Sequence, residues 1–441
     1  MVVNRVPKRI STAILNSLRA GVVPRLGLPY IAVGRSREIG ALVQDLDNIS
    51  AGGAGFRFII GRYGSGKSFM LQLLRNTALD RNFVVIDGDL SPERRLSGHK
   101  GQGIATYREL MQNMATKTRP EGGALSSILE RWISSIQADV VAEGSGNPSD
   151  QGFSQVIETK IYTVINQMEG LVHGFDFASV LTTYWRGYCQ DDETMKNAAL
   201  RWLRGEYSTK TEAREHLDVR VIIDDDSWYD YLKLMARFVK QVGYVGLLVL
   251  IDEAVNLYKI SHSITRQNNY EKILTMFNDT MQGRAEYLGI MMGGTPQFLE
   301  DERRGLYSYE ALQTRLAQSR FTRPGAFDAS DPVIRLQSLS QEEVFLLLQK
   351  IADVHRQHYQ YEQRVGNDDL VRFMQVIVNY LGADELLTPR DVLKDLLSLL
   401  YLAQEQEEVS FGQLLDSPQF QPSVRHQSEL DEDGGFAEFT L

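Results

Sequence analysis

The sequence predicts an α/β protein in which helices surround a central parallel sheet. A glycine-rich stretch at Gly61–Ser68 follows an apolar run at Phe56–Ile60 and leads into an apolar helical segment at 69–74. A second apolar run, Leu247–Ile251, has no polar interruption, which is typical of a strand buried on both faces. Further apolar runs of strand length occur at Phe83–Asp87, Tyr287–Thr295 and Val333–Leu336.

The glycine-rich stretch reads Gly-Arg-Tyr-Gly-Ser-Gly-Lys-Ser and matches a phosphate-binding P-loop. Glycines allow the backbone to turn tightly so that several N–H groups point at one anion, and the following helix adds its positive N-terminal end. We expect Lys67 to reach the β- and γ-phosphates of a nucleotide and the Ser68 hydroxyl to ligate Mg²⁺. The alternative is an ordinary glycine-rich turn, but the flanking strand and helix favour the P-loop. The residues predicted to contact nucleotide here are Gly61, Tyr63, Gly64, Ser65, Gly66, Lys67, Ser68 and Phe69.

Two carboxylates, Asp252 and Glu253, directly follow the second apolar run. In parallel α/β sheets the site lies outside the carboxyl ends of the strands, which is where Lys67 and both carboxylates are expected. Asp252 fits the Mg²⁺ position, and Glu253 fits the base that polarises an attacking water. By itself such a pair is more often two solvated residues or a helix N-cap. With a P-loop upstream, it predicts hydrolysis.

The size and composition bound the class of protein. At 441 residues the chain exceeds one ordinary domain and fits a large α/β core with a smaller unit. No apolar run approaches the length of a membrane span, and the N-terminus lacks the apolar core of a secretion signal, so we expect a cytoplasmic protein without membrane contact. The single cysteine, Cys189, excludes an internal disulfide, and we expect it to be at least half buried.

The charge balance gives a weaker constraint on partners. The formal net charge is -10, which argues against a surface that coats a polyanion. Local basic clusters remain, so charge alone does not decide whether nucleic acid binds. These clusters are Lys8–Arg9, Arg94–Arg95 with His99 and Lys100, Arg303–Arg304, and Arg315 with Arg320 and Arg323.

The spacing of apolar residues divides the chain into an N-terminal helical segment at 1–30, a nucleotide-binding core at 31–335 and a helical lid at 336–410. Within the core, residues 104–240 are mostly of helical pattern, which predicts a large insertion before the carboxylate-bearing strand. Such insertions usually carry partner or polymer contacts. Residues 421–441 are acidic and lack periodicity, so we expect a mobile tail. Three helical stripes in the lid lie near 340–360, 368–382 and 388–406.

The order of these elements is the order found in AAA+ ATPases. The chain thus resembles an AAA+ (ASCE) P-loop core with a central parallel sheet, a large helical insertion and a C-terminal α-helical lid. The resemblance implies that Thr295 senses the γ-phosphate and that Arg390, at the start of a lid helix capped by Thr388 and begun by Pro389, reaches the nucleotide. It also implies that Arg315 is an arginine finger that completes a neighbouring subunit's site.

Each of these three assignments has an alternative. Thr295 also fits a strand-ending turn, and Arg390 also fits a simple surface arginine. The finger position of Arg315 is contested by Arg303, Arg304 and Arg320. A finger acting on a neighbour would require an oligomer.

Two further motifs narrow the resemblance. The segment Val33-Gly34-Arg35-Ser36-Arg37-Glu38 resembles the box before the P-loop in initiator-type and STAND AAA+ proteins, which implies that the backbone at Val33 and Gly34 contacts adenine. Over most of residues 10–405 the chain resembles the BREX-system ATP-binding proteins (BrxD-like) of bacterial antiphage defence. Arg62 stands where many relatives carry an acidic residue. The segments that carry this resemblance are Gly61–Ser68, Trp202–Tyr207, Leu250–Glu253 with Asn256–Tyr258, Gly293–Pro296 and Arg304–Tyr309.

The main hypothesis is an AAA+ ATPase that binds and hydrolyses ATP with Mg²⁺ and assembles as a homo-oligomer. It would act on DNA or on a DNA-processing partner, a helicase or nuclease, in antiphage defence. That target rests on the resemblance, because a fold does not determine a function. The alternative is a nucleotide-dependent scaffold or loader that recruits a partner with little hydrolysis. A third hypothesis is that the 104–240 insertion binds nucleic acid, with Arg94, Arg95 and Lys100 contributing.

Overall fold

The chain forms two compact units that are interleaved in sequence. The computed structural model describes residues 5–145, 152–166, 173–318, 327–362, 365–381, 388–406, 408–418 and 420–422. One unit comprises Met1–Ser36, Gly61–Leu73 and Arg335–Leu441, and the other comprises Arg37–Ile60 and Leu74–Ile334. The first therefore contains the P-loop and the predicted lid, and the second contains most of the sheet.

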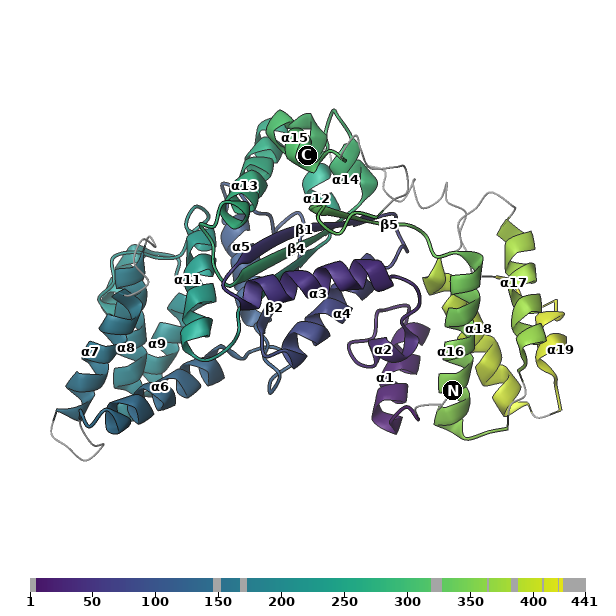
Figure 1. Cartoon of the computed structure of the whole chain (residues 1–441), viewed down its shortest axis with the longest axis horizontal. Coiled ribbons are helices and arrows are strands. Elements are labelled where there is room, and N and C mark those ends of the chain that lie inside the picture. Colours follow the sequence, from purple (N-terminus) through teal and green to yellow (C-terminus); the bar gives the residue numbers. More distant parts are fainter. Residues whose placement is uncertain are drawn as a thin grey trace. The chain divides into compact units, whose positions relative to one another are not determined.

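A five-stranded parallel sheet lies at the centre of the fold, with strand order β2-β3-β4-β1-β5 (Figure 1). The predicted α/β class is therefore confirmed. Each apolar run identified in the sequence forms a strand, because its residues are buried on both faces of the sheet. The strands are β1 (Ala54–Gly61), β2 (Val84–Asp89), β3 (Leu247–Asp252), β4 (Leu288–Gly294) and β5 (Val333–Leu336).

Helices cover both faces of the sheet. On one face, α3 (Ser36–Ser50) packs Ile49 against Gly289 of β4, and α4 (Lys67–Asp80) pairs Arg75 with Asp87 of β2 at 2.9 Å. On the other face, Phe277 of α13 (Ser263–Met281) meets Phe56 with ring centroids 5.8 Å apart. Phe56 and its alternate neighbours therefore face a different helical layer from Arg57, as the period of two in a strand requires.

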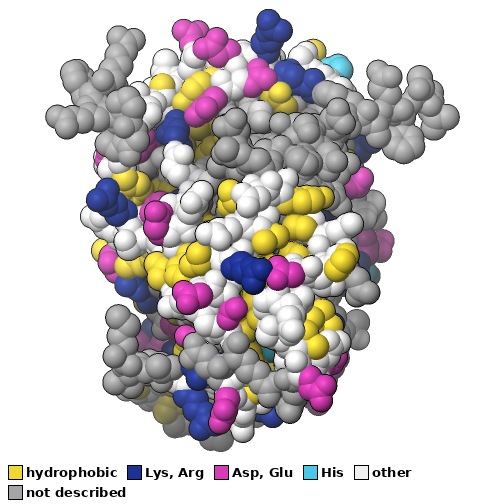
Figure 2. Space-filling view, turned by 90° about the vertical axis from the view of Figure 1, so that its right-hand side faces the viewer, with side chains coloured by type: hydrophobic (Ala, Val, Ile, Leu, Met, Phe, Trp, Pro, Cys, Tyr) yellow, Lys and Arg dark blue, Asp and Glu magenta, His cyan; other side chains and the backbone are white. Residues whose placement is uncertain are grey.

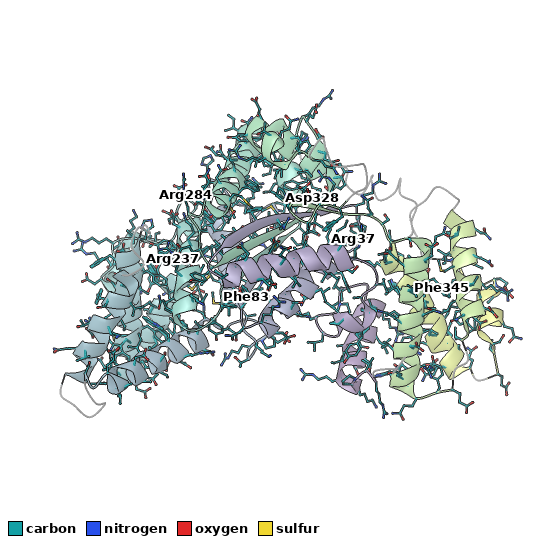
Figure 3. All side chains as sticks on the ribbon, viewed as in Figure 1. Arg37, Phe83, Arg237, Arg284, Asp328 and Phe345 are labelled. Atoms are coloured by element: carbon teal, nitrogen blue, oxygen red, sulfur yellow. The ribbon has the colours of Figure 1, made fainter. Side chains whose placement is uncertain are left out.

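Buried side chains link neighbouring strands of the sheet and connect the sheet to α3. Phe83, labelled in Figure 3, lies immediately before β2 and is buried. Its ring approaches the backbone of Gly246 before β3. Arg57 of β1 pairs with Asp45 of α3 at 2.7 Å and donates to the carbonyls of Ala329 and Asp331 ahead of β5. These contacts hold α3 and the β5 end of the sheet together.

The segment between β2 and β3 is helical and is built around its last helix, α11 (Trp228–Gln241) (Figure 1). Phe238 of α11 meets Trp132 at 5.0 Å and Phe177 at 5.6 Å between ring centroids, and Tyr231 meets Trp202 at 5.3 Å. Three other helices thus converge on α11. The remaining helices are α5 (Gln102–Gln112), α6 (Leu125–Ala142), α7 (Phe153–Asn166), α8 (Gly174–Gln190), α9 (Glu193–Leu203) and α10 (Lys210–Leu217).

Short helices follow the carboxyl ends of β3 and β4. They are α12 (Val255–Tyr258), α14 (Pro296–Glu300), η1 (Leu306–Ser308) and α15 (Glu310–Leu316). Tyr270 of α13 donates a hydrogen bond to the carbonyl of Arg304 at 2.6 Å, which ties the segment between α14 and η1 to that helix.

In the other unit, the N-terminal helix packs on the C-terminal helices. Ser11 of α1 (Lys8–Arg19) bonds His358 at 2.8 Å, and the Arg19 guanidinium lies 4.7 Å from the Tyr401 ring centroid. The face in Figure 2 carries hydrophobic, acidic and basic side chains intermixed. The other helices are α2 (Leu28–Ile31), α16 (Gln341–Tyr359), α17 (Asn367–Leu381), α18 (Pro389–Glu405) and α19 (Phe411–Leu415).

Three expectations from the sequence concern Cys189, the acidic tail and membrane contact. Cys189 is exposed, because it lies one residue before the end of α8 on the solvent side, so the prediction that it is half buried was wrong. The predicted acidic tail spans residues 421–441, and from residue 423 onward it lies outside the described residues. Among the described helices, none has both the length and the apolar character needed to cross a membrane.

Candidate nucleotide site

The P-loop begins where β1 ends at Gly61, and its glycines are required by its geometry. Gly64 and Gly66 have φ values of 77° and 94°, in the left-handed region that glycine adopts without strain. A Cβ on Gly61 would lie 2.2 Å from Ser65 Oγ and 3.1 Å from Leu336. The loop therefore turns tightly, and a side chain at Gly61 would not fit between Ser65 and Leu336.

Lys67 opens α4 and folds back over this loop. Its Nζ donates to the carbonyls of Gly61 at 2.9 Å and Arg62 at 3.0 Å. The N–H of Met70 bonds the Gly66 carbonyl at 2.9 Å, so the helix starts directly from the loop. Exposed Ser68 and half-buried Phe69 form its first turn. The ammonium and the helix N-terminus together give a positive concave loop suited to phosphates.

Arg35 connects the segment before α3 to the P-loop. Its guanidinium donates to the Ser65 carbonyl at 3.2 Å and to the Gln337 carbonyl. Gly34 lies against α16, since a Cβ there would be 2.2 Å from Glu343 Oε1. The predicted adenine-contact segment, Val33 with Gly34, thus belongs to the same unit as the loop and is tied to it by its own neighbour.

The start of α18 approaches the P-loop from another direction. Arg390 donates a hydrogen bond to the Tyr63 hydroxyl, and its guanidinium carbon lies 5.2 Å from the centroid of the Tyr63 ring. A Cβ on Gly64 would lie 3.1 Å from Thr388. Thr388 is the N-cap residue with Pro389 at the first helical position, as predicted, but its hydroxyl contacts Asp391 at 2.6 Å instead of a backbone N–H.

In the sheet-bearing unit, three carboxylates gather at the carboxyl ends of β2 and β3. Asp89 is the register partner of Asp252, and the Asp252 carbonyl accepts the N–H of Leu90 at 3.0 Å. The backbone N–H of Glu253 donates to Asp252 Oδ1 at 2.8 Å, and Glu253 itself has a φ of 58°. Left-handed backbone at a non-glycine residue is strained, so the surrounding contacts must hold Glu253 in this position.

Asp89 was missed by the sequence analysis, which ended that strand at Asp87. Burial raises the pKa of Asp89, the negative charges of Asp252 and Glu253 raise it further, and Arg94 opposes them. Arg94 bonds the Asp89 carbonyl at 3.0 Å and pairs with Glu109 of α5 at 3.3 Å. The mutual repulsion indicates a concentration of negative charge that a cation would relieve. The sequence signal that could have identified Asp89 is its position as a carboxylate at the end of the strand that pairs with β3.

Thr295 follows β4 and caps the next helix. Its hydroxyl accepts the N–H of Phe298 at 3.3 Å, and Pro296 occupies the first position of α14. The backbone N–H of Ala254 bonds the Gly293 carbonyl at 3.0 Å, which joins the end of β4 to the residue after the carboxylate pair. Thr295 thus caps a helix rather than forming the strand-ending turn considered as the alternative, and its hydroxyl can still donate its proton to a second group.

The arginines proposed as fingers differ in their surroundings. Exposed Arg315 on α15 donates to Asn278 Oδ1 at 3.1 Å and to the carbonyl of Ala311 at 2.6 Å. Arg304 points inward, because it donates to two carbonyls of the α12 segment at 3.3 Å and lies over the Tyr258 ring. Arg303 is exposed. Arg320 and Arg323 lie outside the described residues.

The residues present fit a Mg²⁺ ion that arrives with a nucleotide. Within the described ranges there is no group of three or more His, Cys, Asp or Glu side chains arranged to hold a metal. Protein-bound Mg²⁺ commonly uses one or two carboxylates, with phosphates and waters supplying its other ligands. Asp252 and Glu253, at the carboxyl end of β3, are the carboxylates available for this at the sheet edge.

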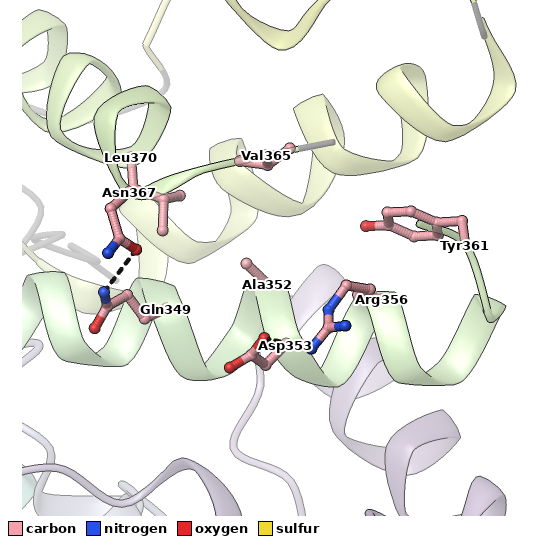
Figure 4. A pocket seen from close by; sticks show the side chains of 8 residues that line it. All are labelled: Gln349, Ala352, Asp353, Arg356, Tyr361, Val365, Asn367 and Leu370. Carbon is pink, nitrogen blue, oxygen red and sulfur yellow. Dashed lines mark hydrogen bonds and ion pairs between the residues drawn. The ribbon is translucent and has the colours of Figure 1, made fainter. Parts of the chain in front are cut away.

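Two other features lie apart from these motifs. The Gly205–Glu206 turn packs on α5, since Arg108 donates to the Gly205 carbonyl at 2.6 Å and Tyr107 to that of Leu203 at 2.8 Å. A cavity of about 190 Å³ lies between α16 and α17 and includes none of the predicted site residues (Figure 4). Its lining is Gln349, Ala352, Asp353, Arg356, Tyr361, Val365, Asn367 and Leu370.

Comparison with known proteins identifies the family of the chain. No curated protein matches the sequence significantly. The family model described as BREX system ATP-binding protein BrxC/D matches residues 6–419, which include the P-loop, the carboxylate pair and the C-terminal helices. The chain therefore belongs to the BrxC/D family of BREX-system ATP-binding proteins.

Proposed function

We propose that this chain is a Mg²⁺-dependent ATPase. The observation that carries the proposal is Glu253, a non-glycine residue with φ 58° directly after β3, whose N–H is held by the Asp252 carboxylate. Strained backbone persists only where surrounding contacts hold it, and at the end of a sheet strand, beside a second carboxylate, it is typical of active sites. It presents two carboxylates at the sheet edge from which a base can act.

The P-loop binds the phosphates in this proposal. Its backbone N–H groups and the N-terminus of α4 receive the anionic oxygens, and Lys67 neutralises charge on the β- and γ-phosphates. Support comes from the glycine conformations of the loop and from Lys67 Nζ, which already lies over the carbonyls of Gly61 and Arg62. The backbone at Val33 and Gly34 contacts the adenine ring of the nucleotide.

The carboxylates organise the reaction. Ser68 and Asp252 would hold Mg²⁺, and the ion would supply positive charge to neutralise the phosphate oxygens. Glu253 orients a water and accepts its proton as the water oxygen bonds to the γ-phosphorus. The bond from that phosphorus to the β,γ-bridging oxygen breaks, and ADP and phosphate are released. Thr295 donates its hydroxyl proton to the reacting water or phosphate.

Two arginines, Arg390 and Arg315, contribute further positive charge to the phosphates. Arg390, at the N-terminal end of α18, contacts the phosphates within the same subunit. Arg315 acts on the nucleotide of a neighbouring subunit, so the active form is a homo-oligomer. The exposure of Arg315 on α15 is consistent with this role, whereas the inward contacts of Arg304 make it a poorer candidate.

The target of the ATPase is DNA or a DNA-processing partner, a helicase or nuclease, within a BREX defence system. The family supports the BREX setting. Of the basic cluster after β2, Arg94 is engaged by Glu109 and Arg95 is half buried, while His99 and Lys100 are exposed. A DNA contact there would depend on Lys100 more than on Arg94.

Steady-state phosphate release tests the ATPase. The wild-type chain is expected to turn over ATP with Mg²⁺ and to lose turnover when the metal is chelated. Arg315→Ala should be inactive alone and partly restored by mixing with Lys67→Ala, because mixed assemblies pair an intact P-loop with an intact finger. ATP binding without turnover under all conditions, including added DNA, would contradict the proposal and favour a nucleotide-dependent scaffold.

A further inference from the structure

Tyr63 is an aromatic residue inside the P-loop whose side chain contacts the start of a distant helix. The hydroxyl accepts a hydrogen bond from Arg390, and the guanidinium also lies 5.2 Å from the ring centroid. We infer that Tyr63 is a positioning residue that holds the Arg390 guanidinium beside the P-loop before nucleotide binds. The inference rests on the proposed phosphate contact of Arg390.

The P-loop does not depend on this contact for its own conformation. Arg35 holds the Ser65 carbonyl at 3.2 Å, Lys67 holds two loop carbonyls, and the loop N–H of Ser65 bonds the Arg62 carbonyl at 3.1 Å. The Tyr63 side chain is 56% exposed, so its ring contributes little to the core. Its partner is therefore the lid arginine and not the loop.

The backbone that carries Arg390 is already fixed next to the loop. Thr388 is buried, and its side chain packs against Gly64. A Cβ added to Gly64 would lie 3.1 Å from the Thr388 side chain. The stem of Arg390 passes Gly21, with its Cδ 3.8 Å from where a Cβ on that glycine would be. What remains free is the end of a long, exposed side chain, and the Tyr63 hydroxyl and ring restrict that end.

A tether of this kind favours phosphate binding. A guanidinium has five N–H donors, so one bond to Tyr63 leaves the others available. An arginine side chain loses rotamer entropy when it is ordered, and part of that loss is incurred before the nucleotide arrives. Charge-assisted bonds to phosphate are stronger than a bond to a neutral phenol, so the tether does not compete effectively with the nucleotide.

A double-mutant cycle on the full chain tests the inference by equilibrium binding of a fluorescent ATP derivative. Tyr63→Ala is expected to weaken binding about three- to tenfold, and Tyr63→Phe, which keeps the ring, by a smaller factor. In an Arg390→Ala background, Tyr63→Ala should change the affinity by less than about twofold. Tyr380 on α17 is 51% exposed and supplies the matched control, since Tyr380→Ala should leave affinity unchanged.

Two results would overturn the inference. One is an unchanged affinity in Tyr63→Ala, and the other is an equal loss with and without Arg390, which would mean that Tyr63 acts on the nucleotide alone. Thermal melting of each variant shows whether the chain is folded. Because the readout is binding, absence of turnover would contradict the proposed ATPase without altering the values expected here.

Discussion

The carboxylate of Asp252 accepts a hydrogen bond from the backbone N–H of Glu253 at 2.8 Å, and this bond spans the point where the chain enters left-handed backbone at φ 58°. The first carboxylate thus helps to hold the second at the end of β3. In the sequence the pair resembles two solvated acids. In the fold a hydrogen bond links the two residues, and the left-handed backbone of Glu253 costs conformational energy.

The left-handed backbone at position 253 predicts that a glycine variant is more stable than an alanine variant, the reverse of the usual order. An L-residue in left-handed backbone pays roughly 1–2 kcal/mol that glycine avoids. Glu253→Gly should therefore be more stable than Glu253→Ala by about 1 kcal/mol, although glycine ordinarily destabilises. Chemical unfolding of both variants measures this difference. An alanine variant at least as stable as the glycine variant would show that position 253 is unstrained.

The close approach at Gly61 predicts a specific loss of nucleotide binding. A Cβ there would lie 2.2 Å from Ser65 Oγ and 3.1 Å from Leu336, and forced overpacking costs about 1–3 kcal/mol. Gly61→Ala should weaken ATP binding about tenfold or more, as 1.4 kcal/mol corresponds to tenfold. Equilibrium binding of ATP is the measurement.

Gly40 supplies the control for that variant. It is exposed within α3 and has no neighbouring heavy atom within 4 Å of a Cβ. Gly40→Ala should stabilise the chain by about 1 kcal/mol and leave ATP binding unchanged. Equal binding losses in both alanine variants would argue against a local effect at the P-loop.

A buried histidine predicts acid sensitivity. His355 is fully buried beside Tyr359, Tyr361 and Tyr401, and burial, with a smaller contribution from His358, lowers its pKa from 6.5 to about 4. The unfolded chain binds the proton more readily, so the stability present above pH 6.5 is lost as the pH falls from 6.5 toward 4. The loss amounts to roughly 3 kcal/mol at most.

Thermal unfolding at about pH 7 and about pH 5 measures this sensitivity, because the ordinary histidine pKa lies between them. His355→Gln should lower stability at the higher pH and should show a smaller decrease on acidification than the wild type. Exposed His99 provides the matched control, and His99→Gln should keep the wild-type decrease. An undiminished decrease in His355→Gln would assign the acid sensitivity to other groups.

The sequence predicted the strands well because their apolar runs are buried on both faces, as in β3 and β4. It placed the end of β2 too early, since Gly88 and Asp89 are not apolar, although they continue the pairing with Ile251 and Asp252. Asp89 was missed for that reason. Helices of four or five residues, such as α2 and α12, are too short to show a periodic pattern.

Long-range side-chain contacts were beyond sequence reasoning for a different reason. Tyr63 and Arg390 are 327 positions apart, and nothing in local propensity or spacing relates them. Both had been proposed to contact nucleotide, but the contact between them depends on how α18 packs in its unit. In the same way, the inward orientation of Arg304 follows from its tertiary partners, so sequence alone left it as a competitor of Arg315 for the finger position.

ATP turnover by Glu253→Gln, measured together with its ATP affinity, tests the central claim most directly. Glutamine keeps the shape of the side chain but cannot accept the proton of water, and loss of a general base costs about 100-fold or more in rate. We expect that loss in turnover, with ATP affinity within about twofold of the wild type because the phosphates bind through the P-loop. Equal and appreciable turnover in the two proteins would contradict the assignment of Glu253 as the base.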